Sequence, residues 1–153
     1  ENNIPINPSM TEAPDQSYGE EKKVAETWKL GIKLRFLVEW SQQQGIAGTQ
    51  TTREICEDLV KPATQALQVS YCELLLRSES TAEFVGPPSV FISHAWSYNF
   101  LEVLEALTSY FAAEDVVIWF DVFSHNQHSS ASLDTEWWCS TFKNAIHSFG
   151  RTV

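Results

Sequence analysis

The stretch from residue 87 to residue 121 constrains the fold of this chain more than any other. It contains two apolar runs, residues 89–93 and 116–120, and each has about the length of a buried strand. Neither run alternates polar with apolar residues, which is typical of strands covered on both faces. A helical pattern of about a dozen residues separates the runs and is long enough for a crossover between parallel neighbours. The stretch therefore predicts a strand–helix–strand unit with two parallel strands.

The intervening helix has clear signals for its start and its buried face. Asn99 can cap the helix, and Glu102 follows three residues later. Five apolar residues recur at helical spacing: Phe100, Val103, Leu104, Leu107 and Phe111. We predict a turn after this helix at residues 113–115, and then the second strand, which we extend from Val116 to Phe123.

The α/β alternation continues after the second strand. Residues 125–134 form a polar loop, and a helix should start at Asp134 or Thr135. Its apolar positions face the sheet: Trp138, Phe142, Ile146 and Phe149. Gly150 stands where a glycine commonly ends a helix, so residues 151–153 lie where a third strand would begin. We therefore expect the chain to be part of a longer protein.

The N-terminal part of the chain shows a tail and then a long amphipathic pattern. Residues 1–20 hold three of the six prolines and have no apolar periodicity, which predicts a disordered tail. From residue 21 to residue 43 an apolar side chain recurs every four residues, which predicts one helix. The stripe consists of Val24, Trp28, Ile32, Phe36 and Trp40. It is typical of a packing face, and it could also dock on a partner.

Two further helices are predicted before the strand–helix–strand unit. Thr51 and Glu54 form a capping box, so a helix should begin near Thr52 and end near Lys61, before Pro62. A third helix should cover about residues 63–77 and carry four apolar residues on one face: Leu67, Tyr71, Leu74 and Leu75. Residues 79–88 form a polar linker. These patterns divide the chain into a helical extension at 21–80 and an α/β domain at 87–153.

Charge and composition exclude several classes of function. The chain has 153 residues and a net charge of -10, with ten Lys and Arg residues spread along it. Binding to nucleic acid or to an anionic membrane requires clustered basic residues, so neither partner is expected. No stretch approaches the ~20 apolar residues of a membrane span. The three cysteines include no CxxC pair, which favours reduced thiols and a cytoplasmic location.

Polar residues follow both predicted strands, at the ends where ligands bind in open α/β sheets. The sequence S-H-A-W follows the first strand, and D-V-F-S-H-N-Q-H follows the second. The candidate binding residues are Ser93, His94, Trp96, Asp121, Asn126 and His128. An equally simple interpretation is that Ser93 and Asp121 satisfy backbone groups at strand ends while Trp96 only packs.

Two other chemistries receive weak support from the sequence. A zinc site could be drawn from His94, His125, His128 and Cys139, but no two of them form a paired motif on one element. A nucleophile pair of Cys139 or Ser93 with a histidine lacks the glycines of a nucleophile elbow. We therefore expect no metal. The chain also has no glycine-rich phosphate loop.

These motifs together resemble the first half of a Toll/interleukin-1 receptor (TIR) domain. The order V-F-I-S, amphipathic helix, I-W-F-D, polar loop and F-K-N-A-I-H-S-F-G-R-T-V is similar to that family over residues 87–153. S-H-A-W and W-F-D-V-F-S-x-N-Q-H resemble TIR-like domains of uncharacterised multidomain proteins of algae and other protists. The resemblance implies a flavodoxin-like parallel sheet, truncated here after its second helix.

The resemblance also implies two kinds of function. The first is signalling through self-association, with other TIR-like domains or a second copy as partner and residues 124–134 as the association loop. The second is cleavage of NAD(P), in which His94, Ala95 and Trp96 would line the nicotinamide side. The catalytic glutamate of that reaction would lie beyond residue 153, so residues 1–153 alone should be inactive. A third alternative is an interaction scaffold that uses the aromatic stripe at 24–40.

Overall fold

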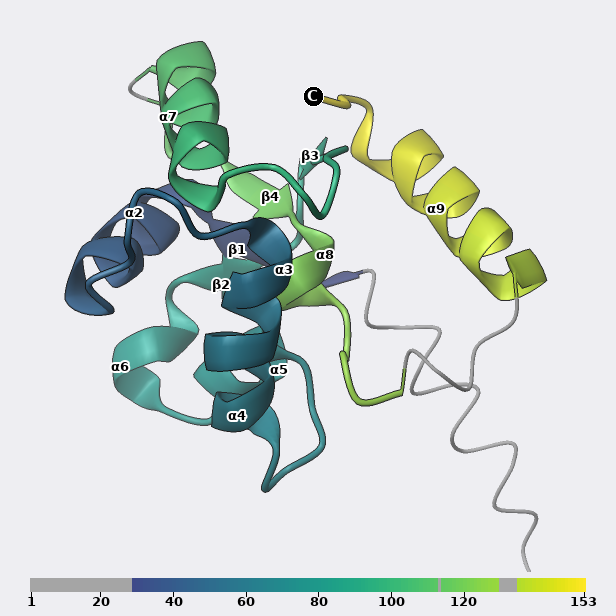
Figure 1. Ribbon diagram of the computed structural model, residues 1–153. Coiled ribbons are helices and arrows are strands. Elements are labelled where there is room, and N and C mark those ends of the chain that lie inside the picture. The colour runs from purple at the N-terminus through teal and green to yellow at the C-terminus, as the bar shows by residue number, and fades with distance from the viewer. Residues whose placement is uncertain (1–28, 113, 130–134) are drawn as a thin grey trace, which may run out of the picture.

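A parallel pair of strands forms one side of a four-stranded mixed sheet (Figure 1). The computed structural model describes residues 29–112, 114–129 and 135–153. The sheet order is β2-β1-β4-β3, with β1 at Gly31–Lys33, β2 at Val85–Gly86, β3 at Val90–Phe91 and β4 at Val117–Trp119. β3 and β4 pair in parallel, with Val90 opposite Ile118 and Phe91 opposite Trp119. The predicted parallel pairing is therefore confirmed.

The last three residues of the chain extend the sheet beyond β3. The Phe91 N–H donates to the Arg151 carbonyl at 2.9 Å, and the Val153 N–H donates to the Phe91 carbonyl at 3.0 Å. The Ser93 N–H in turn donates to the Val153 carbonyl at 2.7 Å. Thr152 pairs with Phe91 in parallel. In the parallel part of the sheet, β4, β3 and residues 151–153 therefore lie side by side in that order.

Helix α7, Phe100–Phe111, connects β3 to β4 as predicted. Asn99 Oδ1 accepts a hydrogen bond from the Glu102 N–H at 3.1 Å, so the predicted cap is present. Four residues of the predicted stripe are buried: Phe100, Leu104, Leu107 and Phe111. The α/β crossover is therefore the part of the fold that local sequence patterns specify most completely.

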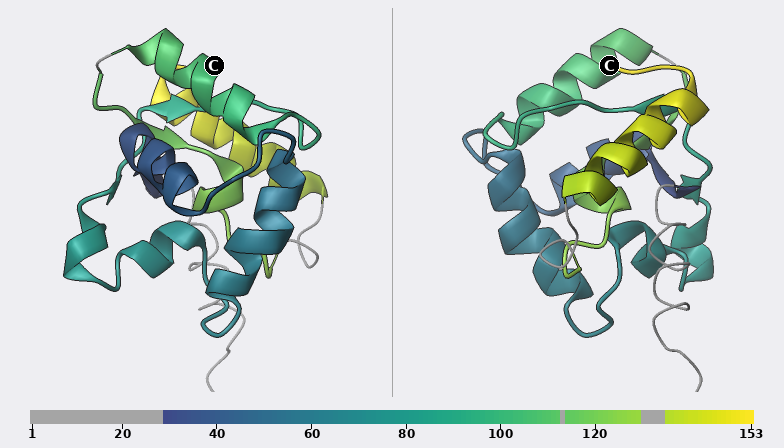
Figure 2. Two further views of the ribbon diagram at one scale, coloured as in Figure 1. Left: turned by 60° about the vertical axis from the view of Figure 1, so that its left-hand side comes forward. Right: turned by 90° about the vertical axis from the view of Figure 1, so that its right-hand side faces the viewer.

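Helices cover both faces of the sheet (Figures 1 and 2). On one face Val90, Ile92, Ile118 and Phe120 join the main core with α7 and with α2, Leu34–Gln43. On the other face Phe91 and Trp119 stack with ring centroids 5.2 Å apart, and Phe149 of α9, Thr135–Phe149, packs on them. Gly150 follows α9 with a φ of 72°, which is the predicted glycine stop. The side chains of Trp138 and Phe142 lie outside the described residues.

The prediction of one helix over residues 21–43 is wrong. Residues 31–33 form β1, which pairs antiparallel with both β2 and β4, and the helix begins only at Leu34. Ile32 is fully buried in the sheet between Val85 and Ile118. The four-residue spacing continues through β1 because a buried strand residue and a helical stripe residue are both apolar. Trp28 and the predicted tail at 1–20 lie outside the described residues.

We predicted that the helix beginning at Thr52 ends before Pro62, but in the structure it continues past this proline. It continues as α3 at Thr52–Ile55, a π-helical turn at Cys56–Val60 and α4 at Lys61–Thr64. The Lys61 N–H donates to the Cys56 carbonyl, five residues back. This wider turn accommodates the proline ring, which would disrupt a regular α-helix. The predicted capping box of Thr51 and Glu54 is present.

The rest of the extension also differs from the prediction. The third helix is short, α5 at Tyr71–Leu75, because Gln68 has a φ of 52° and Ser70 caps a new helix there. Leu67 is 44% exposed and lies before this helix, although we predicted it to share one helix face with Tyr71, Leu74 and Leu75. The predicted linker contains α6, Glu79–Ala82, and β2. The extension is therefore not purely helical, and β1 of the extension and β2 of the linker belong to the same sheet as β3 and β4.

The second strand ends earlier than predicted. After Trp119 the chain forms α8, a single helical turn at Asp121–Ser124. Phe123 of this turn is fully buried and packs edge-on against Trp40, with ring centroids 5.3 Å apart, and against Tyr71 at 5.7 Å. The carboxyl end of β4 is thus packed against α2 and α5. No helix in the described ranges is long and apolar enough to cross a membrane.

Candidate functional site

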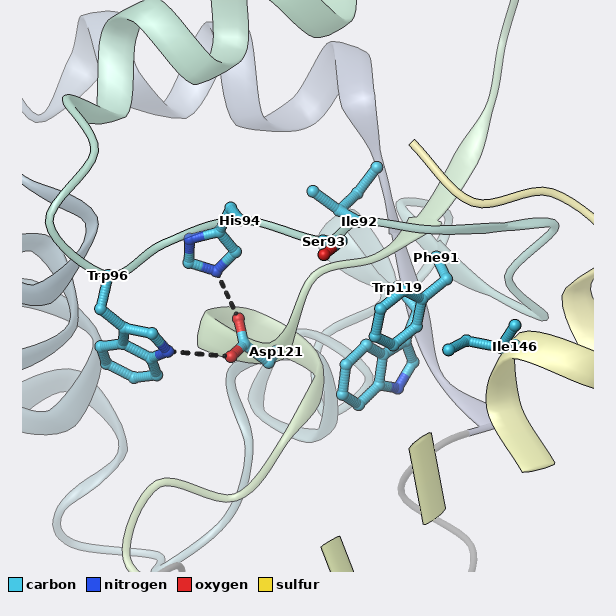
Figure 3. A pocket seen from close by; sticks show the side chains of 8 residues that line it. All are labelled: Phe91, Ile92, Ser93, His94, Trp96, Trp119, Asp121 and Ile146. Atoms are coloured by element: carbon cyan, nitrogen blue, oxygen red, sulfur yellow. Dashed lines mark hydrogen bonds and ion pairs between the residues drawn. The ribbon is translucent and has the colours of Figure 1, made fainter. Parts of the chain in front are cut away.

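Asp121 is the centre of the candidate site (Figure 3). It follows the end of β4 and opens α8. Its Oδ1 accepts hydrogen bonds from the Val122 N–H at 2.8 Å and from His94 Nε2 at 2.8 Å. Its Oδ2 accepts a hydrogen bond from Trp96 Nε1 at 3.2 Å. One carboxylate therefore joins the loops that follow the two parallel strands, as the strand-end argument predicts.

The imidazole of His94 is held on both ring nitrogens. Its side chain is 4% exposed, and its ring contacts Phe120 edge-on with centroids 4.7 Å apart. Because a carboxylate only accepts hydrogen bonds, Nε2 carries the hydrogen donated to Asp121. Nδ1 lies 3.4 Å from the Thr52 hydroxyl, and a neutral ring can accept a hydrogen bond from this hydroxyl at Nδ1. The orientation of His94 is thus fixed by Asp121 at the start of α8 and by Thr52 of the extension.

Trp96 has less freedom than the sequence analysis implied. Its indole N–H is bound to Asp121, and the guanidinium carbon of Arg53 lies 5.7 Å from its ring centroid. The Arg53 N–H also donates to the Trp96 carbonyl at 3.0 Å. Trp96 packs on the main core as a partly buried residue. One face of the ring is therefore covered by the extension.

Thr52 and Arg53 are site residues that the sequence analysis missed. The capping box placed them correctly at the start of a helix, but a local motif does not say what the helix start contacts. The Thr52 N–H donates to the Tyr98 carbonyl at 2.9 Å, and Thr51 pairs with Asn99. These backbone contacts bring the helix start against residues 94–99.

A pocket of about 380 Å³ opens beside these residues at the carboxyl ends of β3 and β4. Its lining residues are Phe91, Ile92, Ser93, His94, Trp96, Trp119, Asp121 and Ile146. In Figure 3 the group around Asp121 forms one side, and the stacked rings of Phe91 and Trp119 approach Ile146 of α9 on the other. The volume falls within the range typical of small-molecule sites.

The structure brings together four of the six candidate residues. Ser93, His94, Trp96 and Asp121 line the pocket. Asn126 Nδ2 instead donates to the Gln68 carbonyl at 2.8 Å. His128 Nε2 lies 2.8 Å from the Thr64 hydroxyl, and that hydroxyl is also 2.9 Å from the Val60 carbonyl. Asn126 and His128 are not among the residues that line this pocket, because they contact the end of helix 52–64 and the residues after it.

His125 and two of the three cysteines are buried. His125 is 2% exposed, and burial lowers its pKa to about 4. Burial raises the pKa of Cys56 and of Cys72 to about 12, while Cys139 is exposed. In the described part of the chain, no three His, Cys, Asp or Glu side chains are grouped so that they could hold a metal ion. The zinc site drawn from the sequence therefore has no support.

Comparison of the chain with protein-family models, with curated proteins and with solved structures gives no match.

Proposed function

We propose that this chain is a TIR-like module that acts in signalling by associating with a second copy or with other TIR-like domains. The observation that carries this proposal is the order of the parallel segments: β4, then β3, then residues 151–153. Along the chain β3 comes first, β4 second and residues 151–153 third, so the spatial order is 2-1-3. A flavodoxin-like sheet has this order at its switch point. Helices on both faces of the sheet agree with that architecture (Figure 2).

Residues 124–134 would be the association loop of a TIR-like domain, and the structure describes this loop up to Ser129. Contacts from Asn126 to the Gln68 carbonyl and from His128 to Thr64 tie this loop to the extension. A loop that is already ordered loses little conformational entropy when it forms an interface. These contacts support a role for residues 126–129 as a preformed part of the association surface.

Sedimentation at increasing protein concentration tests the proposal. We expect the average mass to rise above that of the 17.4 kDa chain. Ser129→Glu in the loop should reduce the rise, because it adds a like charge to the two facing copies. Ser109→Glu, on the exposed surface of α7, is the matched control and should leave association unchanged. A chain that stays monomeric up to about millimolar concentration would rule out self-association, since that limit corresponds to roughly 4 kcal/mol.

The pocket favours a second candidate function, binding and cleavage of NAD. Trp96 and His94 line it at the ends of the parallel strands, where doubly wound sheets bind nucleotides. Calorimetric titration with NAD, followed by chromatography of the mixture, separates binding from turnover. We expect residues 1–153 to show no turnover. Product formation that disappears in His94→Ala would place the catalytic groups within this chain.

A further inference from the structure

We propose that the pocket at the ends of β3 and β4 binds a small organic cation with apolar substituents, for which choline is a suitable probe. This proposal goes beyond association between domains and does not depend on it. It rests on the charge of the pocket and on the chemistry of its two sides.

The charge of the pocket comes from Asp121. Asp121 is the one Asp, Glu, Lys or Arg among the described residues that line the pocket. Its side chain is 17% exposed, so the carboxylate is partly removed from water. Three hydrogen-bond donors contact this carboxylate, namely His94 Nε2, Trp96 Nε1 and the Val122 N–H, whereas a carboxylate offers about four acceptor positions. Asp121 therefore keeps capacity for a cation in the pocket.

His94 donates to the Asp121 carboxylate through Nε2. The Thr52 hydroxyl lies 3.4 Å from His94 Nδ1 and 3.3 Å from the Ala95 carbonyl, so it can donate to either acceptor. With a neutral imidazole, the Asp121 carboxylate is the one formal charge among the described lining residues. Arg53 does not line the pocket. Its guanidinium lies over the ring of Trp96 and is exposed, so solvent screens its charge. The chain as a whole carries a net charge of -10, which also favours cations.

The remaining walls of the pocket suit apolar substituents on the cation. Trp96, Phe91 and Trp119 contribute aromatic rings, and Ile92 and Ile146 contribute aliphatic groups. Aromatic rings attract alkylated ammonium groups, and the attraction strengthens when water is excluded. An inorganic anion would meet the Asp121 carboxylate and, among the lining residues, no Lys or Arg to balance its charge. Carboxylate and rings together select a cation over an anion or a neutral molecule.

Titration of the protein with matched probes tests the inference. One pair is choline and its neutral carbon analogue, in which a tert-butyl group replaces the trimethylammonium group. A planar pair is the N-methylnicotinamide cation and neutral nicotinamide. We expect the charged member of at least one pair to bind about ten-fold more tightly, from the size of desolvated cation–π contacts. Equal affinity in both pairs, or no detectable binding of either cation, overturns the proposal. Inorganic phosphate should not bind, and phosphate binding at the same site would also contradict it.

Two variants locate the binding. Ile146 is 42% exposed, so Ile146→Arg should place a positive charge at the mouth of the pocket, weaken cation binding at least about ten-fold and leave the fold intact. Leu67→Arg is the matched control, because Leu67 is 44% exposed and does not line the pocket. If Ile146→Arg binds the cation like the parent chain, the cation lies elsewhere and the proposal fails.

Asp121→Asn separates charge from shape. This variant keeps the size of the side chain, and a melting curve shows whether it folds. In the folded variant the preference for the charged probe should fall to about two-fold or less, while the neutral analogue binds as before. A preference for the cation that survives in folded Asp121→Asn would show that the rings alone account for binding and would remove Asp121 from the site.

Discussion

Gly31 and Ile118 approach each other too closely for a side chain to fit between them. A Cβ atom added to Gly31 would lie 2.7 Å from the Ile118 carbonyl oxygen, and it would also lie 2.7 Å from Cβ of Pro88. Both distances are far below ordinary van der Waals contact. Because residue 31 is glycine, β1 can pack closely enough against β4 for the extension to join the sheet.

Replacement of Gly31 should destabilise the protein. We expect Gly31→Ala to lower the free energy of unfolding by about 1–3 kcal/mol, because the added methyl group must push β1 away from β4. Gly48→Ala is the control, since a Cβ atom there meets nothing within 4 Å, and its effect should stay within about 0.5 kcal/mol. Urea unfolding of both variants measures the difference. Equal stabilities would show that β1 can shift at little cost.

The loss of the Asp121 carboxylate should reduce stability as well as ligand binding. Asp121→Ala leaves His94 and Trp96 without their acceptor in a partly buried position, for which we expect a loss of about 2–4 kcal/mol. Glu105→Ala removes an exposed carboxylate from α7 and should cost less than about 0.5 kcal/mol. Thermal and urea unfolding report both values. A loss at Asp121 as small as that at Glu105 would mean that these hydrogen bonds contribute little.

Stability should depend on pH through His125. Burial lowers its pKa to about 4, while an unfolded histidine titrates near about 6.5. Between these values the unfolded chain binds the proton and the folded chain does not, so stability falls as the pH drops from about 6.5 to about 4. The histidine contributes a loss of about 2–3 kcal/mol over this range. In His125→Gln the free energy of unfolding should depend less steeply on pH, and an unchanged slope would contradict the assignment.

The contact between Thr64 and His128 should order the loop after α8. Thr64→Val keeps the side-chain shape but removes the hydroxyl, so we expect a loss of about 1–2 kcal/mol and faster amide exchange at 126–129. Thr108→Val is the matched control, since the Thr108 hydroxyl also bonds to carbonyls of its own helix, those of Leu104 and Glu105. Hydrogen exchange in that variant should leave the loop unchanged. The same exchange rates at 126–129 in both variants would show that His128 does not depend on Thr64.

The three thiols should differ in reactivity. Burial holds the pKa of Cys56 and Cys72 near about 12, so neither forms a thiolate readily, whereas Cys139 is exposed. A thiol reagent at neutral pH should modify one cysteine quickly and the other two only after denaturation. Cys139→Ser should abolish the fast phase. Rapid modification of two or three thiols in the native protein would mean that the core around Cys56 and Cys72 opens easily.

The sequence by itself determined the crossover unit, the start of α7 and the end of α9. The apolar runs that contain β3 and β4, the Asn99 cap and the Gly150 stop are signals carried by residues close together in the chain. The same signals placed the polar side chains of His94 and Asp121 at one edge of the sheet. Their hydrogen bond therefore follows from strand order and parallel pairing.

Only the tertiary structure decided the rest. Ile32 fits the spacing of a helix, but sheet pairing with Ile118 and Val85 overrides that local pattern. Pro62 predicts a helix end, yet a π-helical turn accommodates it. Thr52 and Arg53 reach His94 and Trp96 across about forty positions of the chain, and His128 turns to Thr64 instead of the pocket. These contacts join segments far apart in the sequence, and no local pattern records which distant surface a helix start or a loop will meet.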